Sequence, residues 1–176
     1  MVVWLTGLSG AGKSTIATAL VGLAKPRIPS LISIDGDVIR DLFGAGLGFD
    51  EESRKAQIQR IQRLSLFLAT QDIPVITSAL YCHPDLMRWN RENLPGYFEV
   101  YVDTPLATVM ERDTKGLYAK ALAGETRHVV GMDVPWHAPQ TPDLVVRTAG
   151  TSPERLAEEI FEAAFERRSS TISDGE

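Results

Sequence analysis

A short apolar run followed at once by a glycine-rich segment is the feature that most constrains this chain. The run is VVWLT at residues 2–6, and the next eight residues, GLSGAGKS at 7–14, fit the pattern G-x-x-x-x-G-K-[ST]. An amphipathic helical repeat follows, with Ile16, Leu20 and Leu23 on one side. A flexible Gly/Ser turn could match the pattern by chance, but the flanking strand and helix favour a loop whose amides hold phosphate groups.

The chemistry of such a loop gives its polar side chains distinct roles. Glycines let the backbone curl so that its N–H groups point at phosphate oxygens, and the helix that follows adds its N-terminal dipole. Lys13 is expected to place its charge on the β- and γ-phosphates of ATP, and the Ser14 hydroxyl to ligate Mg²⁺. Thr15 fits either an assisting role or an ordinary position in the first helical turn.

Five short apolar runs alternate with helical patterns along the chain. The runs lie at residues 2–6, 31–34, 73–77, 98–102 and 143–146. The helical patterns lie at residues 13–24, 51–70 and 105–113, and a last one begins near 151–153. Strands that alternate with helices predict an α/β fold with a five-stranded parallel sheet covered on both faces. Catalytic groups are then expected at the carboxyl ends of the strands.

Length and composition limit the remaining choices. A chain of 176 residues suits one domain, predicted at 1–167, followed by a disordered tail at 168–176. The net charge of -5 argues against a general nucleic-acid binder. A single cysteine, Cys82, fits a reducing compartment, and no run reaches the roughly 20 apolar residues that cross a membrane. The N-terminus lacks the features of a signal peptide, so a cytoplasmic protein without membrane contact is expected.

Two carboxylates follow the second predicted strand. Asp35 and Asp37 flank Gly36 directly after LISI, so both are expected beside the phosphate loop, with Arg40 close by. One carboxylate could hold Mg²⁺ through water while the other orients or deprotonates an attacking hydroxyl. An Asp that caps the next helix is the alternative, and the two interpretations can coexist.

Two basic segments are candidates for binding anions. In the helix after Phe49, Arg54 and Gln57 share one side, although a basic helix face is often simply solvated. The segment Arg112–Lys120 combines cations, a glycine and an aromatic residue, which suits a lid of about residues 112–133 that closes over phosphates.

With these segments in hand, the chain resembles the adenylylsulfate kinases from Val2 to about Ile160. The matching stretches are GLSGAGKST, the Asp35-Gly36-Asp37…Arg40 segment, Leu47-Gly48-Phe49, Glu99–Asp103, Arg112-Asp113, Lys115–Tyr118, Gly131–Asp133 and Ala138-Pro…Pro142-Asp-Leu144. The resemblance implies a P-loop NTPase fold of the nucleotide-kinase type with a lid. It implies Mg-ATP-dependent phosphorylation of the ribose 3′-hydroxyl of adenylylsulfate. Such kinases are often dimers, so a homodimer is among the expected states.

The resemblance also assigns roles to residues. ATP contacts are implied at Gly10, Ala11, Gly12, Lys13, Ser14, Thr15 and Arg112. Acceptor contacts are implied at Arg40, Phe49, Arg54, Gln57, Lys115, Leu117 and Lys120. Ser14 and Asp35 are placed near the metal, and Lys13, Asp35 and Asp37 are the predicted catalytic residues.

Several departures from the family pattern fall on the acceptor side. Gln57 stands where the family usually has Asn, and Ala79–His83 replaces a Phe-Ile-Ser-Pro-Tyr run. Val129 replaces an aromatic residue of the lid, so an adenine stacked on Phe49 loses a second wall worth roughly 1 kcal/mol. Together with the Trp89–Asn93 run, these departures resemble a branch associated with surface-polysaccharide modification. There the implied acceptor is cytidine diphosphoramidate.

Three alternatives therefore stand beside an adenylylsulfate kinase. The first is a cytidine-diphosphoramidate kinase with the same ATP site. The second is a nucleoside monophosphate kinase, which lacks the Lys115–Tyr118 match. The third is a non-catalytic nucleotide-binding regulatory protein, against which the presence of Lys13, Ser14, Asp35 and Asp37 argues.

Overall fold

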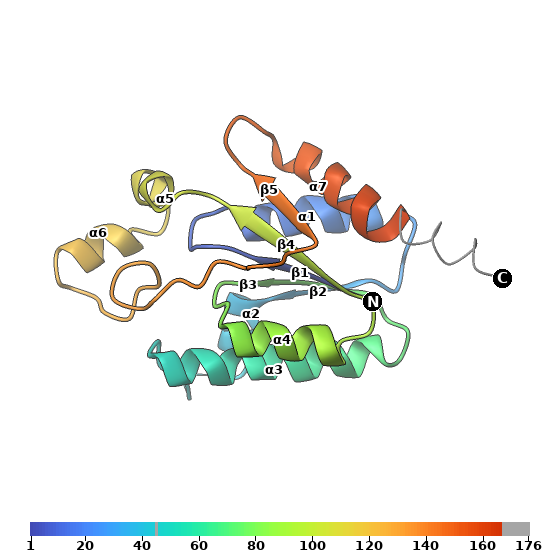
Figure 1. Ribbon diagram of the computed structural model, residues 1–176, viewed down its shortest axis with the longest axis horizontal. Coiled ribbons are helices and arrows are strands. Elements are labelled where there is room, and N and C mark those ends of the chain that lie inside the picture. The colour runs from blue at the N-terminus through green and yellow to red at the C-terminus, as the bar shows by residue number, and fades with distance from the viewer. Residues whose placement is uncertain (45, 167–176) are drawn as a thin grey trace.

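The computed structural model describes residues 1–44 and 46–166 (Figure 1). The predicted tail at 168–176 lies outside the described residues. No helix in the described ranges is both long and apolar enough to cross a bilayer.

The centre of the molecule is a five-stranded parallel sheet, as predicted. Its strands are β1 (Val2–Thr6), β2 (Ile32–Asp35), β3 (Val75–Ala79), β4 (Tyr97–Asp103) and β5 (Leu144–Arg147). Their order across the sheet is β2-β3-β1-β4-β5, and every neighbouring pair is parallel. All five residues of β1 are buried, because this central strand is covered on both faces.

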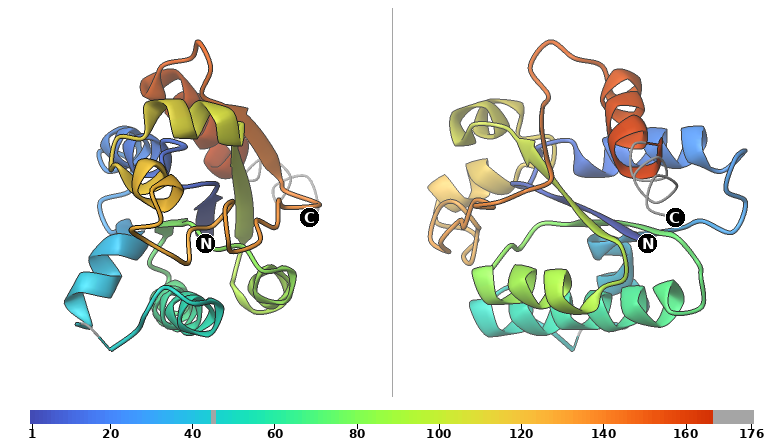
Figure 2. Two further views of the ribbon diagram at one scale, coloured as in Figure 1. Left: turned by 90° about the vertical axis from the view of Figure 1, so that its left-hand side faces the viewer. Right: turned by 45° about the vertical axis from the view of Figure 1, so that its right-hand side comes forward.

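Helices cover both faces of the sheet and complete the three layers (Figure 1). One face carries α1 (Lys13–Ala24) and α7 (Pro153–Phe161), which is followed by a π-helical turn at Glu162–Glu166. The other face carries α2 (Gly36–Leu42), α3 (Glu51–Ala69) and α4 (Pro84–Asn93). The short helices α5 (Leu106–Arg112) and α6 (Leu117–Leu122) lie beyond the carboxyl ends of the strands (Figure 2, left).

Capping side chains fix where the helices on the two faces begin. Asp50 accepts hydrogen bonds from the Ser53 amide, at 2.9 Å, and from its hydroxyl, at 2.7 Å, at the start of α3. Ser152 accepts from the Arg155 amide at the start of α7, where Pro153 occupies the first turn. The polar residue before each apolar repeat therefore sets the helix boundary.

The structure also differs from the predicted elements. The third strand begins at Val75 instead of residue 73, because Pro74 has no amide to donate to a ladder. Helices α4 and α6 were not predicted, since each is too short to show several repeats of an apolar face.

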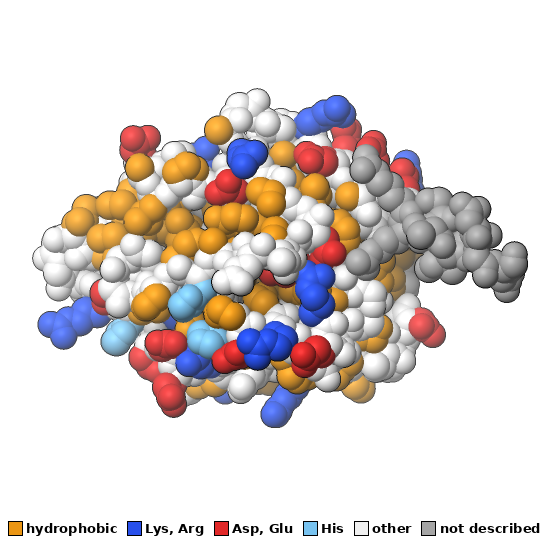
Figure 3. All heavy atoms as spheres, in the orientation of Figure 1, with side chains coloured by type: hydrophobic (Ala, Val, Ile, Leu, Met, Phe, Trp, Pro, Cys, Tyr) orange, Lys and Arg blue, Asp and Glu red, His pale blue; other side chains and the backbone are white. Residues whose placement is uncertain are grey.

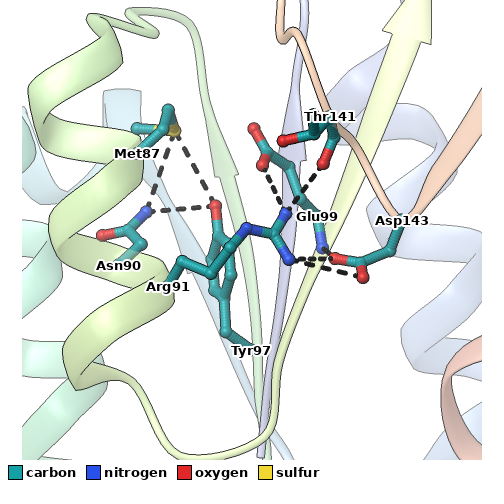
Figure 4. Close-up of polar contacts among 7 residues, drawn as sticks. All are labelled: Met87, Asn90, Arg91, Tyr97, Glu99, Thr141 and Asp143. Atoms are coloured by element: carbon teal, nitrogen blue, oxygen red, sulfur yellow. Dashed lines mark hydrogen bonds and ion pairs between the residues drawn. The ribbon is translucent and has the colours of Figure 1, made fainter.

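A polar network ties α4 to the amino ends of β4 and β5 (Figure 4). Arg91 pairs with Glu99 at 3.0 Å and with Asp143 at 3.2 Å, and burial raises the pKa of the Glu99 carboxyl. Beside it, the buried Tyr97 hydroxyl contacts Asn90 and the Met87 sulfur. This network lies at the amino-terminal end of the strands, whereas the phosphate loop lies at their carboxyl-terminal end.

Candidate active site

A cavity of about 870 Å³ lies at the carboxyl ends of the strands, between the phosphate loop, α2, α3 and the segment around α6. This volume is at the upper end of the range for ligand pockets. The sequence-predicted residues that line it are Gly10, Gly12, Lys13, Ser14, Thr15, Asp35, Asp37, Arg40, Phe49, Arg54, Gln57, Arg112, Lys115, Leu117 and Lys120. Ala11 does not line the cavity: its methyl group is fully buried and its amide donates to the Leu8 carbonyl at 3.2 Å.

The phosphate loop, residues 7–14, leaves β1 through a close backbone contact. A Cβ atom at Gly7 would lie 2.6 Å from the Val102 carbonyl oxygen, so only glycine fits there. Gly12, with φ of 97°, precedes α1 in a left-handed conformation that glycine adopts without strain. These two constraints explain why the loop needs glycine at its first and last glycine positions.

Lys13 turns back under the loop. Its ammonium donates to the carbonyls of Gly7, at 2.9 Å, and Leu8, at 2.8 Å. Burial of this ammonium lowers the pKa of Lys13 to about 8, even though nearby Asp37 and Asp35 oppose the shift. The residue as a whole is only partly buried. A cation held in this way is free to exchange two carbonyls for an anionic ligand.

Asp35 is the centre of a hydroxyl cluster beside the loop. Its Oδ2 accepts hydrogen bonds from Ser14 and Ser78, each at 2.7 Å, and its Oδ1 accepts from the Asp37 amide at 2.9 Å. Burial alone would raise the pKa of this carboxyl, but these hydrogen bonds and one from the Val38 amide bring it below its ordinary value. Asp35 also caps α2, so the capping interpretation is confirmed, while its role at a metal ion stays a prediction.

Asp37 lies across the cavity mouth from the segment that precedes α6. Its Oδ2 accepts from the Lys115 ammonium at 2.7 Å, and both side chains are mostly exposed. This hydrogen bond is the main reason why the pKa of Lys115 is raised. An exposed pair of this kind contributes at most about 1 kcal/mol. It can therefore separate at little cost when a ligand enters.

Two guanidinium groups lie close to the ring of an exposed phenylalanine. The Phe49 ring is 55% exposed, and the guanidinium carbons of Arg40 and Arg54 lie 4.6 Å and 5.8 Å from its centroid. Arg40 donates to the carbonyls of Leu47 and Gly48, which fixes the loop that carries the ring. An aromatic face and two cations thus meet on one wall of the cavity.

Two cavity-lining side chains on α3 have polar atoms that are buried and unpaired among the described residues. Arg54 is 8% exposed and donates through Nη2 to the His128 carbonyl, while its Nε has no partner. Gln57 is 4% exposed and donates to the Gly36 carbonyl at 3.1 Å, while its Oε1 has no partner. Burial and the proximity of Arg40 lower the pKa of the Arg54 guanidinium. Because buried polar groups are normally paired, these atoms suit a ligand that supplies both an acceptor and a donor.

Residues after β4 complete the far wall of the cavity. Arg112 donates from Nη1 to the Thr148 hydroxyl at 3.1 Å, which holds the guanidinium near the phosphate loop. The Asp133 carboxylate accepts from the amides of His128 and Val129 and so shapes the turn that faces α3. Val129 is buried in the cavity wall, where it presents a small aliphatic surface.

Sequence reasoning did not single out two residues that the cavity includes. Ser78 is the penultimate residue of β3 and contacts Asp35, and a polar residue near the carboxyl end of a buried strand was the available signal. Tyr81 also lines the cavity, 3% exposed, and its hydroxyl donates to Glu51 at 3.0 Å. It lies within the Ala79–His83 run, where a departure from the family pattern was noted without a contact being assigned.

Comparison with known proteins gives consistent relatives. The chain is 46% identical over 147 residues to an adenylyl-sulfate kinase from Deinococcus deserti, covering 84% of this chain and 81% of the relative. It is 39% identical over 167 residues to an adenylyl-sulfate kinase from Chloroflexus aurantiacus, covering 95% and 89% of the two chains.

The fold is matched as well. The structure of the Mycobacterium tuberculosis APS kinase in complex with AMPPNP and APS aligns with a TM-score of 0.85 and 33% identity. This alignment covers 92% of the present chain and 95% of the other. The sequence model of the family described as adenylylsulphate kinase matches residues 1–147. The chain therefore belongs to the adenylylsulphate kinase family.

Proposed function

We propose that this protein transfers the γ-phosphoryl group of ATP to the ribose 3′-hydroxyl of adenylylsulfate. The observation that carries this proposal is the convergence, in one cavity, of a complete phosphate loop with the Arg40–Phe49–Arg54 wall in a member of this family. The two relatives are adenylyl-sulfate kinases, and the solved relative binds both AMPPNP and APS.

On the donor side, the loop amides and the Lys13 ammonium would bind the β- and γ-phosphates. Lys13 is already charged below pH 8 and gives up two neutral carbonyls for a polyanion, which makes the exchange favourable. Arg112, held by Thr148, would neutralise charge at the outer phosphates. In a loose phosphoryl-transfer transition state, positioning and charge neutralisation of this kind supply most of the rate enhancement.

The donor set also fits Mg²⁺. Ser14 and Asp35 present a hydroxyl and a carboxylate oxygen 2.7 Å apart at the end of the loop, and Mg²⁺ prefers few protein oxygens together with water and phosphates. The ion would neutralise charge between the β- and γ-phosphates when bound. Ser78, as a second donor to Asp35, holds the carboxylate in place for this role.

On the acceptor side, Phe49 would stack on the base while Arg40 and Arg54 bind the phosphosulfate anion. Lys115, Leu117 and Lys120 face the same space from the other wall. The 3′-oxygen attacks the γ-phosphorus, the bond from that phosphorus to the β,γ-bridging oxygen breaks, and ADP leaves. Asp37 is the better candidate to receive the hydroxyl proton, because the oxygens of Asp35 are already occupied by three donors.

The test is ADP release from Mg-ATP with adenylylsulfate and cytidine diphosphoramidate in parallel, with the position of the new phosphate established by mass and NMR. Turnover of adenylylsulfate to its 3′-phosphate at a higher kcat/KM supports the proposal. A clear preference for the cytidine compound would assign the altered wall around Gln57, Tyr81 and Val129 to a different acceptor. ATP binding without transfer to either compound would refute the proposed activity.

A further inference from the structure

A buried tyrosine connects α6 to the phosphate loop. Tyr118 is 2% exposed, and its hydroxyl donates to the backbone carbonyl of Ser9 at 3.0 Å, across 109 positions of sequence. Burial raises the pKa of this phenol to about 12, so the hydroxyl keeps its proton and acts as a donor throughout the physiological pH range. None of the roles assigned above uses this residue.

The hydrogen bond fixes one peptide plane of the loop. In a trans peptide the C=O and the next N–H point in opposite directions. Because the Ser9 carbonyl is turned toward Tyr118, the Gly10 N–H is turned away from it. Gly10, with φ of 75°, lines the cavity, and its amide has no hydrogen-bond partner among the described residues.

The position of Tyr118 is itself fixed. The Asp113 carboxylate accepts from the Tyr118 amide at 3.1 Å and the Ala119 amide at 2.8 Å, which anchors the first turn of α6. On the preceding helix, Val109 is fully buried, and a Cβ atom at Gly10 would lie 3.8 Å from it. Helices α5 and α6 therefore support the phosphate loop from behind.

All three carbonyls at the start of the loop have an internal donor. Lys13 binds the carbonyls of Gly7 and Leu8, and Tyr118 binds that of Ser9. Lys13 is expected to leave its carbonyls when it binds phosphate, whereas the hydroxyl of Tyr118 approaches from outside the cavity. The hydrogen bond from Tyr118 to the Ser9 carbonyl can therefore keep the Gly10 amide turned toward the phosphates both before and after ATP binds.

We propose that Tyr118 is a positioning residue for ATP: its hydroxyl orients the Ser9–Gly10 peptide so that the Gly10 amide faces the phosphates. This inference rests on the proposed ATP-dependent function. The same hydrogen bond attaches α6, which carries Leu117 and directly follows Lys115 and Gly116, to the phosphate loop.

The test is Tyr118→Phe, which keeps the ring and removes only the hydroxyl. The matched control is Tyr97→Phe, since Tyr97 is also buried and its hydroxyl bonds to Asn90 and Met87 in the network of Figure 4, away from the loop. Direct binding of Mg-ATP is measured by calorimetry, and thermal unfolding is followed for both variants. KM for each substrate is then determined.

The hydroxyl orients a donor to a charged group, so we expect Tyr118→Phe to weaken Mg-ATP binding about threefold to tenfold. The acceptor KM should change less than about twofold, and Tyr97→Phe should leave ATP binding within about twofold, however much its Tm falls. Unchanged ATP affinity in Tyr118→Phe, or an equal loss in both variants, would overturn the proposal.

A second variant and the separate measurement of ATP binding complete the experiment. Should Tyr118→Phe fail to fold, Asp113→Ala, which releases the turn that holds Tyr118, must show the same selective loss of ATP affinity, and its absence would overturn the proposal. Because calorimetry needs no acceptor, a wild-type protein that binds ATP but phosphorylates neither nucleotide would refute the proposed function while leaving the Tyr118 comparison valid. A wild-type protein that does not bind Mg-ATP would overturn both.

Discussion

Removal of the Arg54 side chain should separate acceptor binding from ATP binding. Arg54 lies on α3, away from the phosphate loop, and its buried Nε has no partner among the described residues. A hydrogen bond from a charged donor is worth about 1.5–3 kcal/mol. We therefore expect Arg54→Ala to lower kcat/KM for adenylylsulfate by roughly 10- to 150-fold, since 1.4 kcal/mol corresponds to a factor of ten.

The fold should change much less. The variant loses the hydrogen bond to the His128 carbonyl, about 1.5–3 kcal/mol for a charged donor, and a cation–π contact with Phe49 of about 0.5–1 kcal/mol. It also removes the burial cost of the charged guanidinium and its repulsion from Arg40, which together lower the pKa of Arg54 in the native protein. These effects oppose one another, so the free energy of unfolding should fall by less than about 2 kcal/mol.

The assay is initial-rate ADP release with each substrate varied at saturating concentration of the other. Arg63→Ala is the matched control, because Arg63 lies on the same helix with its side chain exposed. It should leave both KM values within about twofold, as is usual for an exposed position. If Arg54→Ala instead raises the KM for ATP and leaves the acceptor unaffected, the assignment of this wall to the acceptor is wrong.

Three other outcomes follow from the phosphate loop. Lys13→Ala should reduce kcat at least about a hundredfold in a folded protein, the scale for losing one transition-state charge partner, as measured by ADP release. Because the pKa of Lys13 is lowered to about 8 and bound phosphates favour its charged form, ATP binding near pH 8 should take up a fraction of a proton and weaken at higher pH. Calorimetry in two buffers of different ionisation enthalpy measures this uptake. Gly7→Ala should destabilise the fold by about 1–3 kcal/mol, because its Cβ would meet the Val102 carbonyl at 2.6 Å. Gly22→Ala, on a helix with nothing within 4 Å, should slightly stabilise it in the same melting experiment.

Local patterns in the sequence were sufficient to predict the first strand, the phosphate loop and the first helix. The strand, loop and helix around residues 2–24 occur with the predicted bounds, because each is specified by neighbouring residues: a buried β-run, spaced glycines and an apolar repeat. The pair Asp35 and Asp37 was placed correctly for a similar reason. Asp35 is the last residue of β2, and a carboxylate at the end of a strand in a parallel sheet must lie at the carboxyl edge of that sheet.

Contacts between distant segments could not be predicted in this way. Arg54 meets the His128 carbonyl across 74 positions, and Tyr118 meets Ser9 across 109. In both pairs the acceptor is a backbone carbonyl, which every residue possesses, so no side-chain pattern marks the partner. The shape of the acceptor wall thus depends on loop conformations, such as the turn shaped by Asp133, that a single sequence does not reveal.

The charge of the cavity suits the two anionic nucleotides of the proposed reaction, although the protein as a whole is acidic. The chain carries a net charge of -5, yet seven Lys and Arg side chains line the cavity against three Asp. Net charge therefore describes the rest of the surface, shown for one face in Figure 3, and not the site. Arg40 and Arg54 both lie near Phe49, and their positive charges repel each other in the unliganded protein. A bound anion relieves that repulsion. This relief contributes to the binding free energy of an anionic acceptor.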